Sequence, residues 1–178
     1  LISKCRLLGK RVITATEMLE SMITNPRPTR AEISDVANAV IDGSSTIMLS
    51  GETSVGKYPQ NVVKTMANIA CSTEKTIKYH DNFMELDFNT KDIPDIISYN
   101  TVGCSFSSNA KAIVVMTNSG RTAKLTARFK PHCPIIALTD VKDVYHKLAL
   151  VDNIIPVYSK IPYGKLGHII RLDERDGW

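Results

Sequence analysis

The chain has 178 residues, 43% of them hydrophobic, and a formal net charge of +4. This composition suits an ordinary globular core, and the scattered Lys and Arg residues lack the clustering that nucleic-acid binding requires. No apolar stretch approaches the roughly 18 residues of a membrane-spanning helix. We therefore expect neither nucleic acid nor a membrane among its partners.

The four cysteines, at positions 5, 71, 104 and 133, lie far apart in the sequence. They form no zinc-binding pair and no dense disulfide framework, so we expect reduced thiols in a cytoplasmic protein. The N-terminus has no apolar signal core, which argues against secretion. The sequence does not begin with Met, and we expect it to be a fragment of a longer chain.

The first half of the chain alternates short apolar strands with amphipathic helices. Thr29 and Glu32 form a capping-box pattern before the clearest helical stripe, and Gly43 ends that stripe. The expected elements are a strand at 12–15, a short helix at 18–23, a helix at 33–41, a strand at 46–49 and a long helix from Pro59 to Ile77.

The second half repeats this alternation after a polar, unpatterned linker at 81–92. Strands that alternate with helices predict parallel βαβ units. The expected elements are a helix of about fifteen residues after Pro94, strands at 112–116, 134–138 and 153–157, and helices at 121–130 and 141–150.

Ligands of parallel α/β proteins bind where strands end, so the loops after the two early strands are candidate sites. Thr16 stands where a helix would begin, and its hydroxyl either caps that helix, which is the commoner role, or binds an anion. Ser50 opens the second loop. Either its hydroxyl faces a substrate that Gly51 lets approach, or the loop is an ordinary turn with Glu52 in solvent, which is again the commoner case.

The loop after the strand at 112–116 is the best phosphate-site candidate. It is short, rich in hydroxyls, and runs directly into a helix, so backbone N–H groups and an arginine would face an anion. A polar turn that binds nothing is equally compatible with this pattern. The loop consists of Thr117, Asn118, Ser119, Gly120, Arg121 and Thr122.

Other catalytic patterns are absent from the sequence. The four histidines have no metal-ligand spacing, no G-x-S-x-G nucleophile motif occurs, and no paired metal-binding carboxylates stand out.

Resemblance to the pyruvate kinase family is carried by two runs, VITATEMLESMITNPRPTRAEISDVANAVIDGSSTIMLSGETSVGKYP and NAKAIVVMTNSGRTAKLTARFKPHCPIIALT. It covers about residues 1–158 and implies an α/β fold: a partial (β/α)₈ barrel followed by an α/β domain with a mainly parallel sheet. The implied parts are the last two strand–helix units of the barrel at 1–82, a linker at 83–92, an incomplete C-terminal regulatory domain at 93–160, and a divergent tail at 161–178.

The resemblance also implies a function. The family transfers a phosphoryl group between phosphoenolpyruvate and ADP, giving pyruvate and ATP in the last step of glycolysis, with Mg²⁺ (or Mn²⁺) and K⁺. Thr16 matches a substrate-binding threonine, and Ser50 matches a catalytic serine near the path that delivers a proton to the enolpyruvate. The loop at 117–122 matches the loop that binds a sugar-phosphate effector. The family is cytoplasmic and usually forms homotetramers.

The sequence departs from the family in two respects. Glu17 replaces the usual glutamine, which adds a negative charge near an anionic substrate. The first six barrel strands are missing, and with them the catalytic lysine, an arginine and the metal and potassium ligands. We therefore expect this chain to be inactive alone. The alternative is a sugar-phosphate-binding or self-association module without catalysis.

Overall fold

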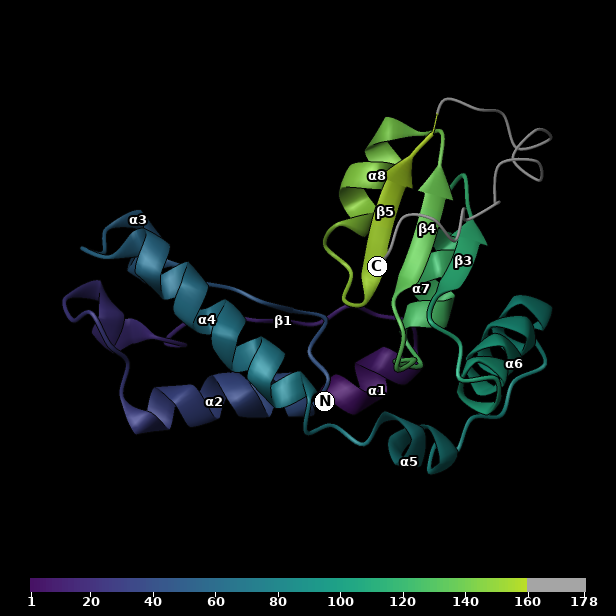
Figure 1. The fold of residues 1–178 in the computed structure, drawn as a ribbon, viewed down its shortest axis with the longest axis horizontal. Coiled ribbons are helices and arrows are strands. Elements are labelled where there is room, and N and C mark those ends of the chain that lie inside the picture. Colours follow the sequence, from purple (N-terminus) through teal and green to yellow (C-terminus); the bar gives the residue numbers. More distant parts are fainter. Residues whose placement is uncertain (160–178) are drawn as a thin grey trace, which may run out of the picture. The chain divides into compact units, whose positions relative to one another are not determined.

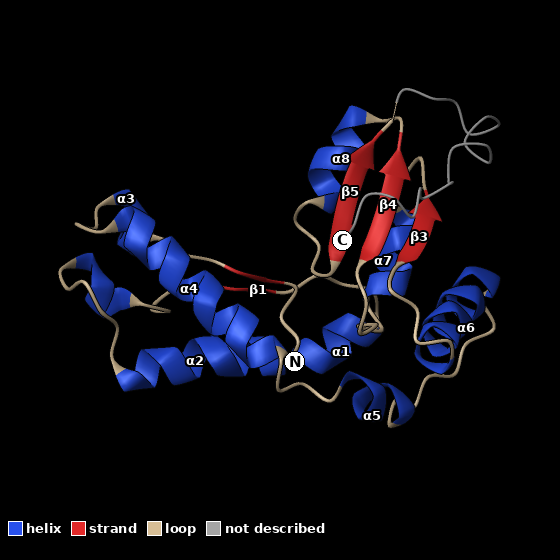
Figure 2. Cartoon of the chain, in the orientation of Figure 1, coloured by secondary structure: helices blue, strands red, loops and turns tan. Residues whose placement is uncertain are grey.

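The computed structural model describes residues 1–159, which form two compact units (Figures 1 and 2). The first unit consists of Leu1–Asn89 together with Arg128–Lys130, and the second contains Thr90–Ala127 and the described residues from Pro131 onward. The division after Asn89 falls inside the predicted linker at 83–92.

The first unit contains two short parallel strands joined by helical segments. Ile13 pairs with Thr46 and Thr14 with Ile47, so the predicted parallel arrangement is confirmed. In chain order the elements are α1 (Ile2–Leu7), β1 (Ile13–Thr14), the 3₁₀ helix η1 (Glu20–Ile23), α2 (Arg30–Ile41), β2 (Thr46–Ile47), α3 (Gly51–Ser54), α4 (Pro59–Glu74) and α5 (Tyr79–Met84).

The start of α2 confirms the predicted capping box. Thr29 Oγ1 accepts a hydrogen bond from the Glu32 N–H, and the Glu32 carboxylate accepts one from the Thr29 N–H at 2.7 Å. The same carboxylate accepts hydrogen bonds from the backbone N–H and the hydroxyl of Ser21, both at 2.6 Å. Glu32 therefore both caps α2 and holds η1 against it.

Apolar side chains from η1, α2 and α4 form the core of the first unit. Leu19 and Met22 are fully buried beside Val36 of α2 and Val62 of α4. Apolar residues spaced three or four apart on α2 and α4 supply this stripe, as the sequence pattern predicts. The two helices contact each other, and Figure 1 shows them approaching toward their C-terminal ends.

Several short elements differ from the predictions. Residues 18–23 form only the 3₁₀ turn η1, and α4 ends at Glu74, before Ile77. The prediction of an unpatterned linker at 81–92 is wrong for residues 81–84, because α5 extends to Met84 and buries Phe83. Helices α1, α3 and α5 were not predicted, because one or two turns are too short to show a helical period.

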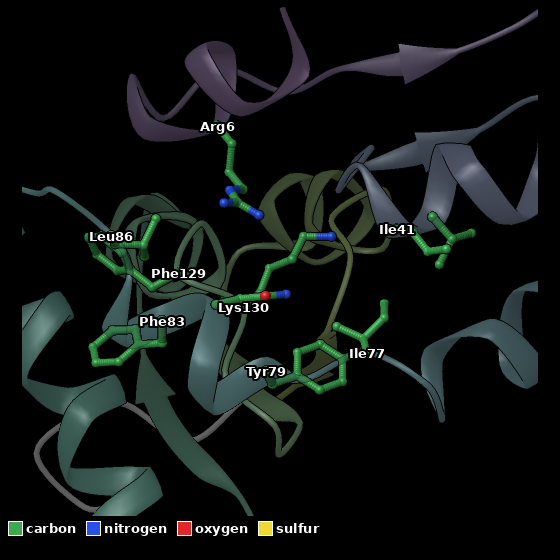
Figure 3. Close-up of a pocket in the computed structure, with 10 residues that line it drawn as sticks. Arg6, Ile41, Ile77, Tyr79, Phe83, Leu86, Phe129 and Lys130 are labelled. Atoms are coloured by element: carbon green, nitrogen blue, oxygen red, sulfur yellow. The ribbon is translucent and has the colours of Figure 1, made fainter.

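The segment Arg128–Lys130 belongs to the first unit, although it lies far along the chain. The Arg128 guanidinium stacks 4.8 Å from the Phe88 ring centre and 4.7 Å from that of Phe129. Arg6 and Lys130 meet at the C-terminal end of α2, within 3.5 Å of the place that a Cβ on Gly43 would occupy. Figure 3 shows them in a small pocket whose other walls include Ile41, Ile77, Tyr79, Phe83 and Leu86.

The C-terminal end of α2 explains why Arg6 and Lys130, two cations, can lie side by side in that pocket. Gly43 has φ +90° and follows Asp42, the C-cap residue of α2, which is the position where a left-handed glycine ends a helix. The exposed carbonyl groups of a helix C-terminus carry partial negative charge and stabilise nearby cations. A side chain at residue 43 would be strained by the positive φ and would crowd the Arg6 guanidinium, whose Nη1 lies 3.0 Å from the Cβ position.

The second unit is built around a three-stranded parallel sheet in the order β3-β4-β5. Its predicted strands and helices are all present, and the predicted α/β fold is confirmed. Helix α7 ends earlier than predicted because Lys130 has φ +49° and Pro131 follows it. The elements are α6 (Ile93–Ser107), β3 (Ile113–Met116), α7 (Arg121–Ala127), β4 (Ile135–Thr139), α8 (Lys142–Leu148) and β5 (Ile154–Tyr158).

Alternating residues of the three strands face α7 and α8. Ile135 and Ala137 of the central strand are fully buried, and α7 contacts β3 and β4 while α8 contacts β4 and β5. On the opposite face, Val114 aligns with Ile136 and Ile155 across the sheet.

Among residues 1–159, none of the helices combines the length and apolar character needed to cross a membrane.

We predict that Glu32→Ala lowers the free energy of unfolding of the first unit by about 2 kcal/mol, because the capped N–H groups and Ser21 lose a charged acceptor. Hydrogen exchange of the α2 amides measures the change. Glu20→Ala is the matched control, since Glu20 is an exposed glutamate of η1, and we expect a change within about 0.5 kcal/mol. Equal losses for both variants would contradict the role given to Glu32.

Candidate active site and effector loop

The loop after β1 carries Thr16 in a strained backbone conformation. Thr16 has φ +72° and Glu17 has φ +53°, and both side chains are exposed. A positive φ is a genuine outlier for a β-branched residue, costs on the order of 1–3 kcal/mol, and persists only where the surroundings impose it. Such strain is concentrated at functional sites, which supports a functional role for this loop.

Thr16 does not cap a helix, so the commoner interpretation of this residue is wrong. The first helical residue after it is Glu20, and the N-cap position belongs to Leu19. Because Thr16 lies three residues before that position, its hydroxyl is not placed to accept the first helical N–H groups. The exposed hydroxyl remains available to a ligand.

The loop after β2 places Ser50 at the start of α3. Ser50 is exposed, and its carbonyl accepts hydrogen bonds from the N–H groups of Thr53 and Ser54. A Cβ on Gly51 would lie 3.3 Å from the Ile23 side chain, so glycine allows α3 to approach η1 closely. Because β1 and β2 are parallel neighbours, Ser50 and Thr16 both lie beyond the same end of the sheet.

Glu52 is buried, and the interpretation that places it in solvent is wrong. Its Oε1 accepts a hydrogen bond from the Leu19 N–H at 3.1 Å, and its Oε2 accepts one from the Ser50 N–H at 2.8 Å. The two donors belong to the two loops that carry Thr16 and Ser50. One carboxylate therefore fixes both loops, and Glu52 is a positioning residue for the site.

The two buried or bridging glutamates stay ionised because backbone groups donate to them. Burial raises the pKa of Glu52, but hydrogen bonds from its own N–H and from Ser50 and Leu19 lower it more, so the pKa lies below its ordinary value of 4.5. Burial likewise raises the pKa of Glu32, and its bonds to Ser21 and Thr29 outweigh that effect. The negative charge on Glu32 also raises the pKa of Glu52, because like charges repel.

In the second unit, the residues of the predicted phosphate loop divide into two groups. Thr117 and Gly120 are buried and shape the turn, because Thr117 Oγ1 accepts a hydrogen bond from the Gly120 N–H at 2.8 Å. Gly120 has φ +74° and packs against Leu148, so a side chain there would be both strained and crowded. The exposed members are Asn118, Ser119, Arg121 and Thr122.

Arg121 is the cation of this loop, and it is paired with Asp92. Its Nη2 lies 3.4 Å from Asp92 Oδ2, and both side chains are largely exposed. Asp92 immediately precedes α6, 29 residues earlier in the chain. The sequence pattern could not reveal this partner, because nothing in the pattern relates Asp92 to the loop.

Among residues 1–159, no group of three or more His, Cys, Asp or Glu side chains is arranged to hold a metal ion. The exposed polar groups beyond the ends of β1 and β2 include the hydroxyls of Thr16 and Ser50.

The fold and the site define a class: a parallel α/β protein with polar loops at the C-terminal ends of its strands, as in barrel and sheet enzymes that bind phosphorylated ligands. The barrel-domain model of pyruvate kinase matches residues 1–63, and its α/β-domain model matches residues 95–172. The second match continues past residue 158, where the resemblance read from the sequence ends. The chain belongs to the pyruvate kinase family.

Individual relatives agree with this assignment. The pyruvate kinase of Geobacillus stearothermophilus is 47% identical over 175 residues, which is 98% of this chain and 29% of that protein. The pyruvate kinase of Leishmania mexicana is 42% identical over 94% of this chain and 34% of its own length. A pyruvate kinase crystal structure from Cryptosporidium parvum is similar with a TM-score of 0.87 and 39% identity, covering 90% of this chain and 33% of that one. The chain thus spans about a third of the length of these relatives.

We predict that Glu52→Gln destabilises the first unit by about 2 kcal/mol at pH 7, because the Leu19 and Ser50 N–H groups lose a charged acceptor. The folded pKa is lowered, so this contribution is fully present above the unfolded value near 4.5 and is lost as the pH falls through the folded pKa. The difference between wild type and Glu52→Gln should therefore shrink below pH 4.5.

Thermal unfolding at a series of pH values measures this difference, and an NMR titration of the Leu19 and Ser50 amide protons reports the protonation directly. Glu17→Gln is the matched control, because Glu17 is an exposed glutamate in the same loop. A loss that is as large at pH 3 as at pH 7, or that Glu17→Gln reproduces, would refute the bridging role.

Proposed function

We propose that this chain forms part of a pyruvate kinase, which transfers a phosphoryl group between phosphoenolpyruvate and ADP to give pyruvate and ATP. Family membership supports the proposal. The observation that carries it is the joint anchoring of the Thr16 and Ser50 loops by Glu52 beyond the same ends of two parallel strands. Such anchoring holds two exposed hydroxyls in fixed positions, as a reacting substrate requires.

In this proposal the two hydroxyls have different roles. Thr16 donates a hydrogen bond to the carboxylate region of phosphoenolpyruvate, which its exposed side chain is free to approach. Ser50 lies on the path by which a proton reaches the enolpyruvate intermediate, and its hydroxyl can pass a proton on. Glu17 is exposed, so its charge can point into solvent and away from the anionic substrate.

The remaining requirements of phosphoryl transfer lie beyond these residues. The reaction depends on positioning and on neutralisation of charge by metal ions and cationic side chains. We propose that Mg²⁺ (or Mn²⁺) and K⁺ serve this purpose, with ligands from parts of the enzyme outside this chain. Within the described residues, the sheet that contains β1 has only two strands, and Ile13 of β1 is 59% exposed. This exposure fits a barrel wall that further strands complete.

We also propose that the enzyme is a cytoplasmic homo-oligomer.

We expect no turnover from the 178-residue chain in a coupled assay with phosphoenolpyruvate, ADP, Mg²⁺ and K⁺. The native protein from its source, whose intact mass is measured in parallel, should be longer and active. In that protein, Ser50→Ala and Thr16→Ala should each lower kcat/KM by about 10²-fold or more, as the loss of a positioned proton-transfer or binding group does. Thr24→Ala is the control, because Thr24 is an exposed residue that follows η1.

Turnover by the pure 178-residue chain would refute its inactivity. Full activity of both Ser50→Ala and Thr16→Ala would refute the roles given to these two residues.

We propose a second, non-catalytic function for the loop at 117–122, the binding of a sugar phosphate. The specific observation is that Thr117 and Gly120 are buried and shape the turn, whereas the other four residues of the loop are exposed. Hydroxyl, amide and guanidinium groups are suitable donors to phosphate oxygens. A bound phosphate at this loop would act as a regulator, since the loop belongs to a different unit from Thr16 and Ser50.

Calorimetric titration with fructose bisphosphate tests this function. Arg121→Ala should weaken binding about tenfold or more, because a charge-assisted contact is lost. Lys111→Ala is the matched control, since Lys111 is an exposed cation that precedes β3 at the opposite end of that strand. Absence of heat for every variant, or equal effects of the two substitutions, would reject the sugar-phosphate function.

A further inference from the structure

We propose that Asp92 determines the anion affinity of the loop at 117–122 by competing with the bound phosphate for Arg121. The proposal rests on the phosphate-binding function of that loop and identifies a residue that regulates it. Its starting point is the ion pair between Asp92 Oδ2 and Arg121 Nη2, which are 3.4 Å apart. The Asp92 carboxylate is thus already paired with the cation that a phosphate at this loop would bind.

The position of Asp92 in the chain explains why its carboxylate is available. Asp92 is the N-cap residue of α6, where an Asp side chain normally accepts a hydrogen bond from the second or third helical N–H. Here it makes no such bond. The second helical residue is Pro94, which has no N–H, so one of the two usual donors is missing.

The local backbone holds the carboxylate near the loop. The Asp92 N–H donates to Thr90 Oγ1 at 3.1 Å, which fixes the segment that enters the helix. The Asp92 carbonyl accepts the Ile96 N–H at 3.0 Å, as a normal helix start does. The main chain of Asp92 is therefore satisfied, and only its side chain is committed to Arg121.

On the other side of the pair, the backbone of the loop is fixed while the arginine side chain can change partner. Gly120 donates to Thr117 Oγ1 at 2.8 Å, and the Arg121 N–H donates to Ser119 Oγ at 3.3 Å. The Arg121 and Asp92 side chains are 66% and 49% exposed, so a dissolved anion can reach the guanidinium. The contact with Asp92 is long and exposed, and such pairs are weak enough to be exchanged.

A phosphate monoester fits this exchange better than another carboxylate. It carries close to two negative charges and three acceptor oxygens, and guanidinium binds it through two parallel hydrogen bonds. It can therefore displace a single carboxylate that approaches only one nitrogen. Because a phosphate must first break the ion pair, its apparent affinity for the loop is lowered by the free energy of that pair. Removing the Asp92 charge should therefore restore the affinity for phosphate.

Calorimetric titration of the full 178-residue chain with inorganic phosphate and with fructose bisphosphate tests the competition. Asp92→Asn should tighten binding about two- to fivefold, the range expected from an exposed ion pair. Asp143→Asn, which removes an exposed acidic side chain from the first turn of α8, should leave it unchanged. In the Arg121→Ala background, Asp92→Asn should give no gain, because the contested cation is gone.

The outcomes separate this proposal from the one on which it rests. Weaker binding by Arg121→Ala with no tightening in Asp92→Asn would overturn the competition but keep the phosphate function of the loop. Absence of binding by wild type, Asp92→Asn and Asp92→Ser would overturn both. Asp92→Ser keeps a hydroxyl at the N-cap without the charge, so tightening in both variants, with unchanged far-UV circular dichroism, would attribute the effect to the lost carboxylate.

Discussion

The first unit depends on one constraint: a carboxylate removed from water must receive hydrogen bonds. A buried charge without donors is costly, and Glu52 is fully buried. Two of its donors, the N–H groups of Leu19 and Ser50, are 31 residues apart in sequence and belong to loops that follow neighbouring strands. Movement of either loop would break one of these bonds to the buried charge, so Glu52 stabilises the positions of both loops.

A second carboxylate acts on the same segment from another element. Glu52 accepts the N–H of Leu19, and Glu32 of α2 accepts the N–H of Ser21, two residues further on. The start of η1 is therefore held between two ionised glutamates whose charges influence each other. This double attachment explains how the preceding residues, Thr16 and Glu17, are kept at positive φ although neither is glycine.

How much of this could be predicted depended on the length of the pattern. Helix α2 was predictable because its capping box and its apolar stripe indicate the same start, and the strands of the second unit because each is a continuous apolar run. Helix α3 has only four residues, too few for a helical period. The burial of Glu52 was missed because a glutamate beside serine and glycine is usually solvated, and only its partners in space reveal otherwise.

The two proposed sites use charge in opposite ways. Beside Thr16 and Ser50, the charged group is buried and accepts hydrogen bonds from backbone N–H groups at 2.8 and 3.1 Å. At the loop of Arg121, the charged group is exposed, makes one long contact and can exchange. Preorganised dipoles that need no rearrangement suit a chemical step, whereas an exposed ion pair that salt and ligands can replace suits reversible binding. The burial of Glu52 and the exposure of Asp92 are therefore consistent with the proposed reaction site in the first unit and the proposed phosphate site in the second.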